Sequence, residues 1–355
     1  MSDLSTPTID GEKVIFFPTA ARWDSSTGNW DVPVHGWIFR PEASSKVQRA
    51  SYTLFRRYLK FKVREELNPL FRERALAFFF VNVRNQQVKI TSAGVETLSS
   101  KSVGHGHFLA LLRVPGDLAE QYMTRDRWLP LEAQDSQLSN SPHIGRALLV
   151  PDEGISVVSD IDDTIKHSEV RDRKQLLANT FLREFKAIPE TAEVYRVWQQ
   201  AGFLFHYVSS SPWQLYQPLE RFLEDQQFPS GTIHLRMLRL RDARLIRIFS
   251  SRSEAKARSI EDLLKNYPRR KFVFVGDSGE RDPEIYGTLA RRYPGQILHS
   301  FIREVPWHRQ LQDRFQKAFR GVPAENWTLF RSIDTARERM QALTRTDQRK
   351  REPQN

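Results

Sequence analysis

S-V-V-S-D-I-D-D-T-I-K-H-S-E, from Ser156 to Glu169, joins a short apolar run to a dense group of aspartates. Val157 and Val158 end the apolar run, a pattern typical of a buried strand in a parallel sheet. Asp160 follows at the carboxyl end of this expected strand. Three aspartates within four positions repel one another near neutral pH, so the group predicts a divalent-cation site. An Asp-rich turn that bends the chain is the alternative this stretch leaves open.

Further apolar runs alternate with helical stretches in the second half of the chain. The expected strands are Ile155–Ser159, Phe203–Val208, Ile233–Leu238, Phe272–Val275 and Ile297–Ile302. This alternation predicts an α/β fold with a doubly wound parallel sheet, of the Rossmann-like type. Ligands bind beyond the carboxyl ends of the strands of such sheets. We therefore expect functional residues in the segments that follow these strands.

Hydroxyl side chains follow the second of these strands. The segment S-S-S-P-W begins at Ser209, and small residues with free backbone N–H groups can hold a phosphate oxygen, with Ser210 beside Ser209. A serine cap with Pro212 in the first helical turn is an equally reasonable interpretation.

Charged residues follow later in the same unit. Lys256 lies in the first turn of an expected helix, where the helix dipole opposes a cation. This position predicts an anionic partner near the lysine, and a solvated surface position is the alternative. The segment F-V-F-V-G-D ends at Asp277 and continues to Asp282, and both carboxylates are expected to complete an oxygen-only Mg²⁺ site with the first aspartates. A capped helix that begins at Pro283 is the alternative.

The rest of the chain is predicted to form separate regions. Residues 1–132 contain short alternating runs that indicate a strand-rich accessory domain, with one helix expected at Val47–Glu66. The remaining regions are a linker at 133–150, a catalytic domain at 151–305, helices packed on it at 306–343 and a polar tail at 344–355. His105 and His107 are expected to bracket a glycine turn, with a metal site as the alternative.

Composition excludes several classes of protein. The chain has 355 residues and no cysteine, which excludes disulfides, thiolate metal sites and a cysteine nucleophile. No apolar run approaches the roughly 20 residues that a membrane span needs. The net charge of +11 favours anionic partners such as phosphorylated small molecules, lipid head groups or nucleic acid.

These motifs together resemble those of haloacid-dehalogenase-like phosphohydrolases. D-I-D-D-T-I-K-H, V-S-S-S-P-W and F-V-F-V-G-D-S-G-E-R-D-P-E-I-Y are more closely similar to the catalytic-domain family of the fungal actin-patch-associated phosphatidate phosphatase and its bacterial relatives. The resemblance covers roughly residues 150 to 305. The family often has histidine directly before the motif lysine, where this chain has Ala255.

The resemblance implies a role for each motif residue. Asp160 is implied as the nucleophile that forms an aspartyl phosphate, and Asp162 as the group that protonates the leaving alkoxide and later activates water. Ser209 and Lys256 are implied to hold phosphoryl oxygens. Mg²⁺ is the implied cofactor. Its implied ligands are Asp160, the backbone carbonyl of Asp162, Asp277 and Asp282. Asp163 and Thr164 are implied to orient the loop.

The implied activity is hydrolysis of phosphatidate to diacylglycerol. The alternatives are a phosphatase for nucleic-acid ends or soluble phosphomonoesters, and a non-catalytic scaffold at a membrane surface. Arg239, Arg241 and Arg244 are expected either to form a solvated face or to attract an anionic membrane. The expected location is the cytoplasm, with attachment to the membrane surface left open.

Overall fold

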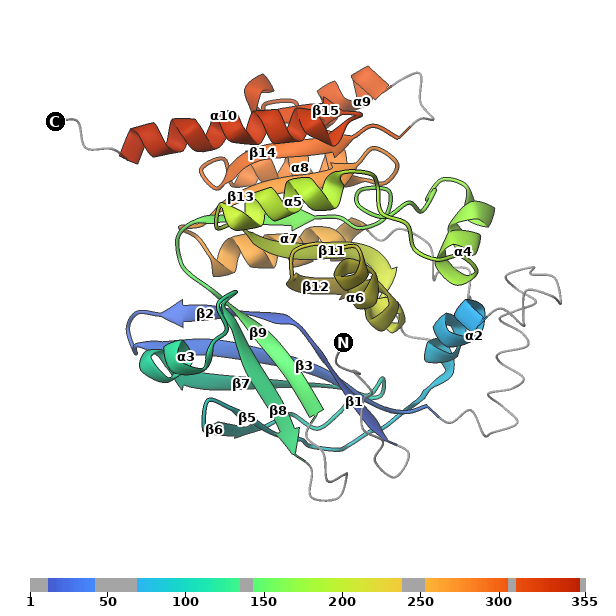
Figure 1. Ribbon diagram of the computed structural model, residues 1–355, viewed down its shortest axis with the longest axis vertical. Helices are drawn as coiled ribbons and strands as arrows, with labels where there is room; N and C mark the ends of the chain where they lie inside the picture. Colours follow the sequence, from blue (N-terminus) through green and yellow to red (C-terminus); the bar gives the residue numbers. More distant parts are fainter. Residues whose placement is uncertain (1–11, 42–68, 135–142, 238–252, 306–310, 352–355) are drawn as a thin grey trace.

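The computed structural model describes residues 12–41, 69–134, 143–237, 253–305 and 311–351. They form an N-terminal sheet and a C-terminal unit of sheet and helices, which are packed against each other (Figure 1). This arrangement matches the predicted combination of an accessory strand-rich domain and a Rossmann-like α/β domain.

Parallel strands form the sheet of the C-terminal unit. Within the described residues it has six strands in the order β12-β11-β10-β13-β14-β15, and every neighbouring pair is parallel. Their bounds are β10 (Ile155–Ser159), β11 (Leu204–Pro212), β12 (Gly231–Arg236), β13 (Lys271–Asp277), β14 (Ile297–Arg303) and β15 (Trp327–Phe330). All five predicted strands are present, and β15 adds a sixth at the edge.

Helices cover both faces of this parallel sheet. One face packs against α4 (Arg173–Phe181), α5 (Thr191–Gln200), α6 (Tyr216–Asp225) and α10 (Ile333–Arg351), and the other against α7 (Ser253–Asn266), α8 (Asp282–Arg292) and α9 (Leu311–Ala318). Short turns η3 (Trp213–Leu215) and η5 (Ala324–Asn326) precede α6 and β15. In the described part of the chain, every helix falls short of the length or apolar character that crossing a bilayer requires.

Burial on both faces explains the continuous apolar runs of the central strands. Val157 and Val158 are neighbours on β10 and both are fully buried, but they point to opposite faces and join different hydrophobic clusters. Val273 and Phe274 do the same on β13. The core therefore fixes the position of the strand ends from both sides.

A larger mixed sheet forms the N-terminal unit. Among the described residues it contains nine strands, and all pairs are antiparallel except β2 with β9. The strands are β1 (Lys13–Phe17), β2 (Thr19–Asp24), β3 (Asn29–Arg40), β4 (Val81–Asn82), β5 (Lys89–Ser92), β6 (Val95–Leu98), β7 (His107–Pro115), β8 (Trp128–Gln134) and β9 (His143–Val150). The helical elements are α2 (Pro69–Leu76), η2 (Ala77–Phe79) and α3 (Gly116–Tyr122).

The two units share a hydrophobic core. Side chains on β1 alternate, so Val14 and Phe16 pack inside the N-terminal unit, whereas Ile15 and Phe17 join the cluster that contains Val157 of the parallel sheet. This period of two is the geometry of a strand with both faces covered. One face of β1 therefore packs against the core of the parallel sheet.

Some predicted boundaries were wrong. The predicted linker at 133–150 contains the end of β8 and all of β9, because the apolar residues 147–150 pair with β2 and β8 and are buried. Helix α10 continues to Arg351 through most of the predicted polar tail. The predicted helix Val47–Glu66 lies outside the described residues.

Candidate active site

Asp160 occupies the carboxyl end of β10, the central position predicted for it. Its N–H donates to the carbonyl of Val275 on the neighbouring strand at 2.9 Å, and its carboxylate accepts from Thr164 Oγ1 at 3.0 Å. The side chain is fully buried. One carboxylate oxygen is thus held by the loop that follows the strand, and the other faces Lys256.

Lys256 joins three carboxylates from two segments, the end of β10 and the connection from β13 to α8. Its Nζ lies 2.6 Å from Asp160 Oδ1, 2.5 Å from Asp282 Oδ1 and 3.6 Å from Glu280 Oε2. Burial disfavours the charged lysine, but Asp160 and Asp282 raise the pKa of Lys256 well above its usual value. The anionic partner predicted for this helix-turn lysine is therefore present, and the surface alternative does not apply.

Three carboxylates form a compact group at the same edge of the sheet. Single ligand atoms of Asp160, Asp277 and Asp282 all lie within 4.8 Å of one another, and all three residues are buried. Asp282 begins α8 and its Oδ2 accepts from the N–H of Asp277 at 3.2 Å, so the helix start and the acidic group predicted as alternatives coexist. Gly276 allows this contact, because a Cβ there would lie 2.3 Å from Asp282 Oδ2.

The charge balance of this group fits a divalent cation. Burial and the neighbouring carboxylates raise the pKa of Asp160 and of Asp277 well above their ordinary values, although Lys256 opposes the shift. Three carboxylates, those of Asp160, Glu280 and Asp282, share the single charge of Lys256 in ion pairs. Asp277 Oδ2 is buried and has no hydrogen-bond partner among the described residues. An oxygen-only donor set with an unpaired buried oxygen suits Mg²⁺.

The carboxylate of Asp162 is held apart from this group by its own partners. Oδ1 lies 2.7 Å from Lys166 Nζ and accepts from Ser168 Oγ at 2.7 Å, and Oδ2 accepts from Ser209 Oγ at 3.1 Å and from Ser211 Oγ at 2.8 Å. Burial alone would raise the pKa of Asp162, but Lys166 and these hydrogen bonds lower it to about 2. The side chain is therefore a fixed, ionised hydrogen-bond acceptor near neutral pH.

The three serines at the carboxyl end of β11 are directed into the site. The pairing of β11 with β12 is irregular between Val208 and Pro212, which frees this segment from the regular ladder. Ser209 and Ser211 both donate to Asp162, and Ser210 Oγ donates to Glu280 Oε2 at 3.3 Å. Neither η3 nor α6 has a side-chain cap, so the capping interpretation of these serines was wrong.

Asp163 holds the loop after the predicted nucleophile. Its φ of 53° lies in the left-handed region, and its carboxylate accepts from the N–H groups of Ser168, Glu169 and Val170 at 2.7 to 2.9 Å. Arg303 on β14 donates to its carbonyl at 2.8 Å. Asp163 therefore shapes the loop, and its carboxylate is already occupied by backbone donors.

The sequence analysis did not single out Lys166, Ser168, Ser211, Glu280 or Arg303. The first two follow the aspartates within six positions, in the segment K-H-S, and Ser211 belongs to the serine triplet. Local spacing could have indicated these three. Glu280 and Arg303 reach the site only through the folding of β13 and β14.

The histidine pair is arranged as a turn into a strand. Gly106 has a φ of 77°, and His107 begins β7. His107 Nδ1 is hydrogen-bonded to His35 Nε2 at 2.7 Å. The expected glycine turn is therefore confirmed.

Comparison with known proteins matches the segment that contains these groups. Residues 155–304 match the family model described as "Phosphatidate phosphatase APP1, catalytic domain". The chain is 37% identical to phosphatidate phosphatase APP1 of Saccharomyces cerevisiae over 154 residues, which are 42% of this chain and 26% of that protein. It is 31% identical to an uncharacterized protein of Schizosaccharomyces pombe over 193 residues, 52% of this chain and 31% of that protein. The chain thus spans about a quarter to a third of the length of these curated relatives.

Proposed function

We propose that this protein, whose residues 155–304 belong to the family of the phosphatidate phosphatase APP1 catalytic domain, is a Mg²⁺-dependent phosphatase that hydrolyses phosphatidate to diacylglycerol. The supporting observation is the buried contact of Asp160 with Lys256, beside Asp277 and Asp282. This arrangement supports Asp160 as the proposed nucleophile, with a cation and an oxygen-only set of side chains beside it at one strand end.

Two displacements at phosphorus complete the proposed reaction. In the first, a carboxylate oxygen of Asp160 bonds to phosphorus, the bond to the ester oxygen breaks, and the alcohol leaves after it takes up a proton. In the second, water attacks the phosphorus of the aspartyl phosphate, which releases inorganic phosphate and restores the carboxylate. Asp162 gives the proton in the first step and accepts one from water in the second.

Asp162 is best prepared for the second of these steps. Lys166, Ser168, Ser209 and Ser211 all stabilise its ionised form, which is the form that accepts a proton. Its role as acid requires that the bound substrate changes some of these contacts. Ser209 and Ser211 are the donors that a phosphoryl group would draw away from Asp162, since hydroxyls also bind phosphate oxygens.

The remaining groups act on the charge of the phosphoryl oxygens. Lys256 donates to these oxygens, and Ser209 with Ser210 adds neutral donors, so charge that develops during transfer is balanced. Mg²⁺ held by Asp160, Asp277 and Asp282, with the backbone carbonyl of Asp162, would supply further positive charge for the same oxygens.

A substrate panel tests this proposal directly. The purified chain is assayed with Mg²⁺ against phosphatidate in mixed micelles, nucleic acid with 3′- or 5′-phosphate ends, and sugar phosphates. Asp160→Asn should abolish turnover, because an amide is not a nucleophile, whereas Asp262→Asn on the exposed side of α7 should retain it. If the protein prefers nucleic-acid ends or sugar phosphates, that class of compound replaces phosphatidate as the proposed substrate. Near-normal activity of Asp160→Asn would refute the nucleophile.

Attachment to an anionic membrane is a separate part of the proposal. Arg239, Arg241 and Arg244 lie outside the described residues, so its support is the basic sequence alone. Replacing all three with glutamine should weaken binding to anionic vesicles and leave turnover of a small soluble phosphate ester unchanged. An equal loss of vesicle binding and of turnover of the soluble ester would contradict a membrane role for these arginines.

A further inference from the structure

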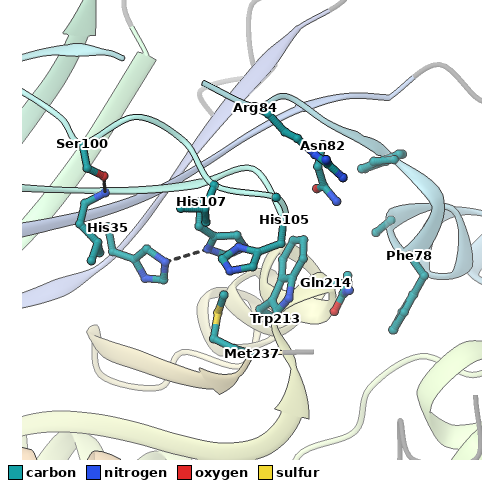
Figure 2. Close-up of a pocket in the computed structure, with 15 residues that line it drawn as sticks. His35, Phe78, Asn82, Arg84, Ser100, His105, His107, Trp213, Gln214 and Met237 are labelled. Carbon is teal, nitrogen blue, oxygen red and sulfur yellow. Dashed lines mark hydrogen bonds between the residues drawn. The ribbon is translucent and has the colours of Figure 1, made fainter. Parts of the chain in front are cut away.

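A cavity of about 960 Å³ lies between the N-terminal sheet and the segments that follow β11 and β12. Its N-terminal side is formed by residues of β3, η2 and β7, and its other side by Trp213, Gln214 and Met237. Figure 2 shows His35 directed toward His107, with Trp213 and Met237 close to this pair. The volume is that of a pocket for a drug-sized or larger organic group.

The wall of this cavity is apolar and nearly uncharged. Its large apolar lining residues are Phe78, Phe80, Leu109, Trp213 and Met237. No carboxylate is among its lining residues in the described part of the chain, and a single exposed arginine is the cation there. Such a lining suits an apolar group and offers little to a phosphate.

Two of the three histidines that line the cavity, His35 and His107, are neutral near physiological pH. Burial lowers the pKa of His107 to about 2 and that of His35 to about 4. His107 is 4% exposed, its Nδ1 is occupied by His35, and its Nε2 has no hydrogen-bond partner among the described residues. When His35 donates to Nδ1, the proton of His107 lies on Nε2, so neither ring brings a charge to the cavity wall.

Apolar side chains continue from the cavity onto the surface. Val103, Leu109 and Met237 line the cavity and are 49%, 60% and 43% exposed. Exposed apolar groups gathered at the opening of an apolar cavity are typical of a ligand-binding groove. They also provide positions where a substitution does not disturb the buried core.

The cavity is joined to the candidate active site through one short segment. Ser211 donates to Asp162 at 2.8 Å, and Trp213 follows two residues later in the wall of the cavity. The ring of Trp213 packs edge-on against His107 with the centroids 4.5 Å apart, and against Trp37 at 4.2 Å. The segment that positions Asp162 is therefore the segment that closes the cavity.

We propose that this cavity binds the apolar ester chains of the phosphate substrate, with the phosphate at Asp160. This inference rests on the proposed function and identifies the part of the protein that selects a lipid ester over a small one. The N-terminal sheet then belongs to the substrate site, since it supplies His35, His107 and Leu109.

The test compares two substrates in variants with a charge at the cavity opening. Leu109→Glu and Met237→Glu should each raise KM for a soluble medium-chain phosphatidate by about tenfold or more, because every methylene that loses burial weakens binding about fourfold. Turnover of p-nitrophenyl phosphate should not change. Ile144→Glu, at a position 74% exposed outside the cavity lining, is the matched control and should behave as the unmodified chain.

Three outcomes would overturn this proposal. Equal loss on both substrates would show an effect on the catalytic groups, and unchanged KM in both cavity variants would show that the chains bind elsewhere. A binding assay with a fluorescent medium-chain diacylglycerol tests the cavity independently of the proposed phosphatase activity. If no phosphate ester is hydrolysed but the probe binds and Leu109→Glu prevents it, the proposed activity fails and the apolar site stands. Absence of probe binding to the unmodified chain would refute the site itself.

Discussion

Gly276→Ala tests whether the carboxylate group binds a metal without removing any charged residue. The new Cβ would lie 2.3 Å from Asp282 Oδ2 and 2.8 Å from its Cβ and Cγ, whereas real Cβ atoms essentially never approach closer than 3.0 Å. The Asp282 oxygen must therefore move by at least 0.7 Å, the difference between 3.0 and 2.3 Å. Metal–ligand distances tolerate deviations of only about 0.2 Å.

The expected result is a higher requirement for Mg²⁺. The concentration that gives half-maximal turnover of a soluble phosphate ester should rise about 10- to 100-fold, and the free energy of unfolding should fall by about 1–3 kcal/mol. Metal titration of activity and urea unfolding measure the two effects. Gly295→Ala is the matched control, because a Cβ there meets nothing within 4 Å. An unchanged Mg²⁺ requirement in Gly276→Ala would refute the metal site at Asp282.

Three further changes test other parts of the structure. Lys166→Met leaves the buried Asp162 carboxylate without its cation and should lower the free energy of urea unfolding by about 3–5 kcal/mol; strict additivity with Asp162→Asn would contradict the pairing. Arg270→Leu removes bonds to the Pro151 and Ile155 carbonyls and should destabilise the chain by about 3 kcal/mol or more, and a loss below about 1 kcal/mol would contradict a structural role. Burial, with Arg339 nearby, lowers the pKa of His299 to about 3, so the unfolded chain binds more protons below about pH 6.5 and stability should fall by about 2 kcal/mol from this residue by about pH 5. Urea unfolding should show that the free energy of unfolding of His299→Gln falls less over this pH range than that of the unmodified chain. An identical pH dependence of the two proteins would contradict the role of His299.

The parallel sheet could be predicted because its strands are buried on both faces. Runs such as Phe272–Val275 are continuously apolar and stand out from the helices between them. The strands of the N-terminal sheet gave weaker signals. Strand β2 contains Ala20, Ala21 and Arg22, which show little alternation, and its parallel partner β9 is more than 100 residues away in the chain. Pairing over such a separation depends on the whole fold.

The candidate site was predictable where its residues follow strand ends. Asp160, Ser209 and Asp277 each come directly after an apolar run, so topology brings them to one edge. Lys256 was identified by its unfavourable place at a helix start. Glu280 was not identified, because no local pattern separates a carboxylate that faces Lys256 from one that faces solvent.

The shared core means that the matched segment is not an independent cooperative unit. Phe17, Trp37 and Phe39 of the N-terminal strands are buried in the same cluster as Phe205 and Tyr207 of the parallel sheet. A fragment cut at Pro151 would expose this aromatic surface to water and would be prone to aggregate. The intact chain should instead melt in a single calorimetric transition. The portion recognisable by sequence comparison is therefore smaller than the portion that must fold together.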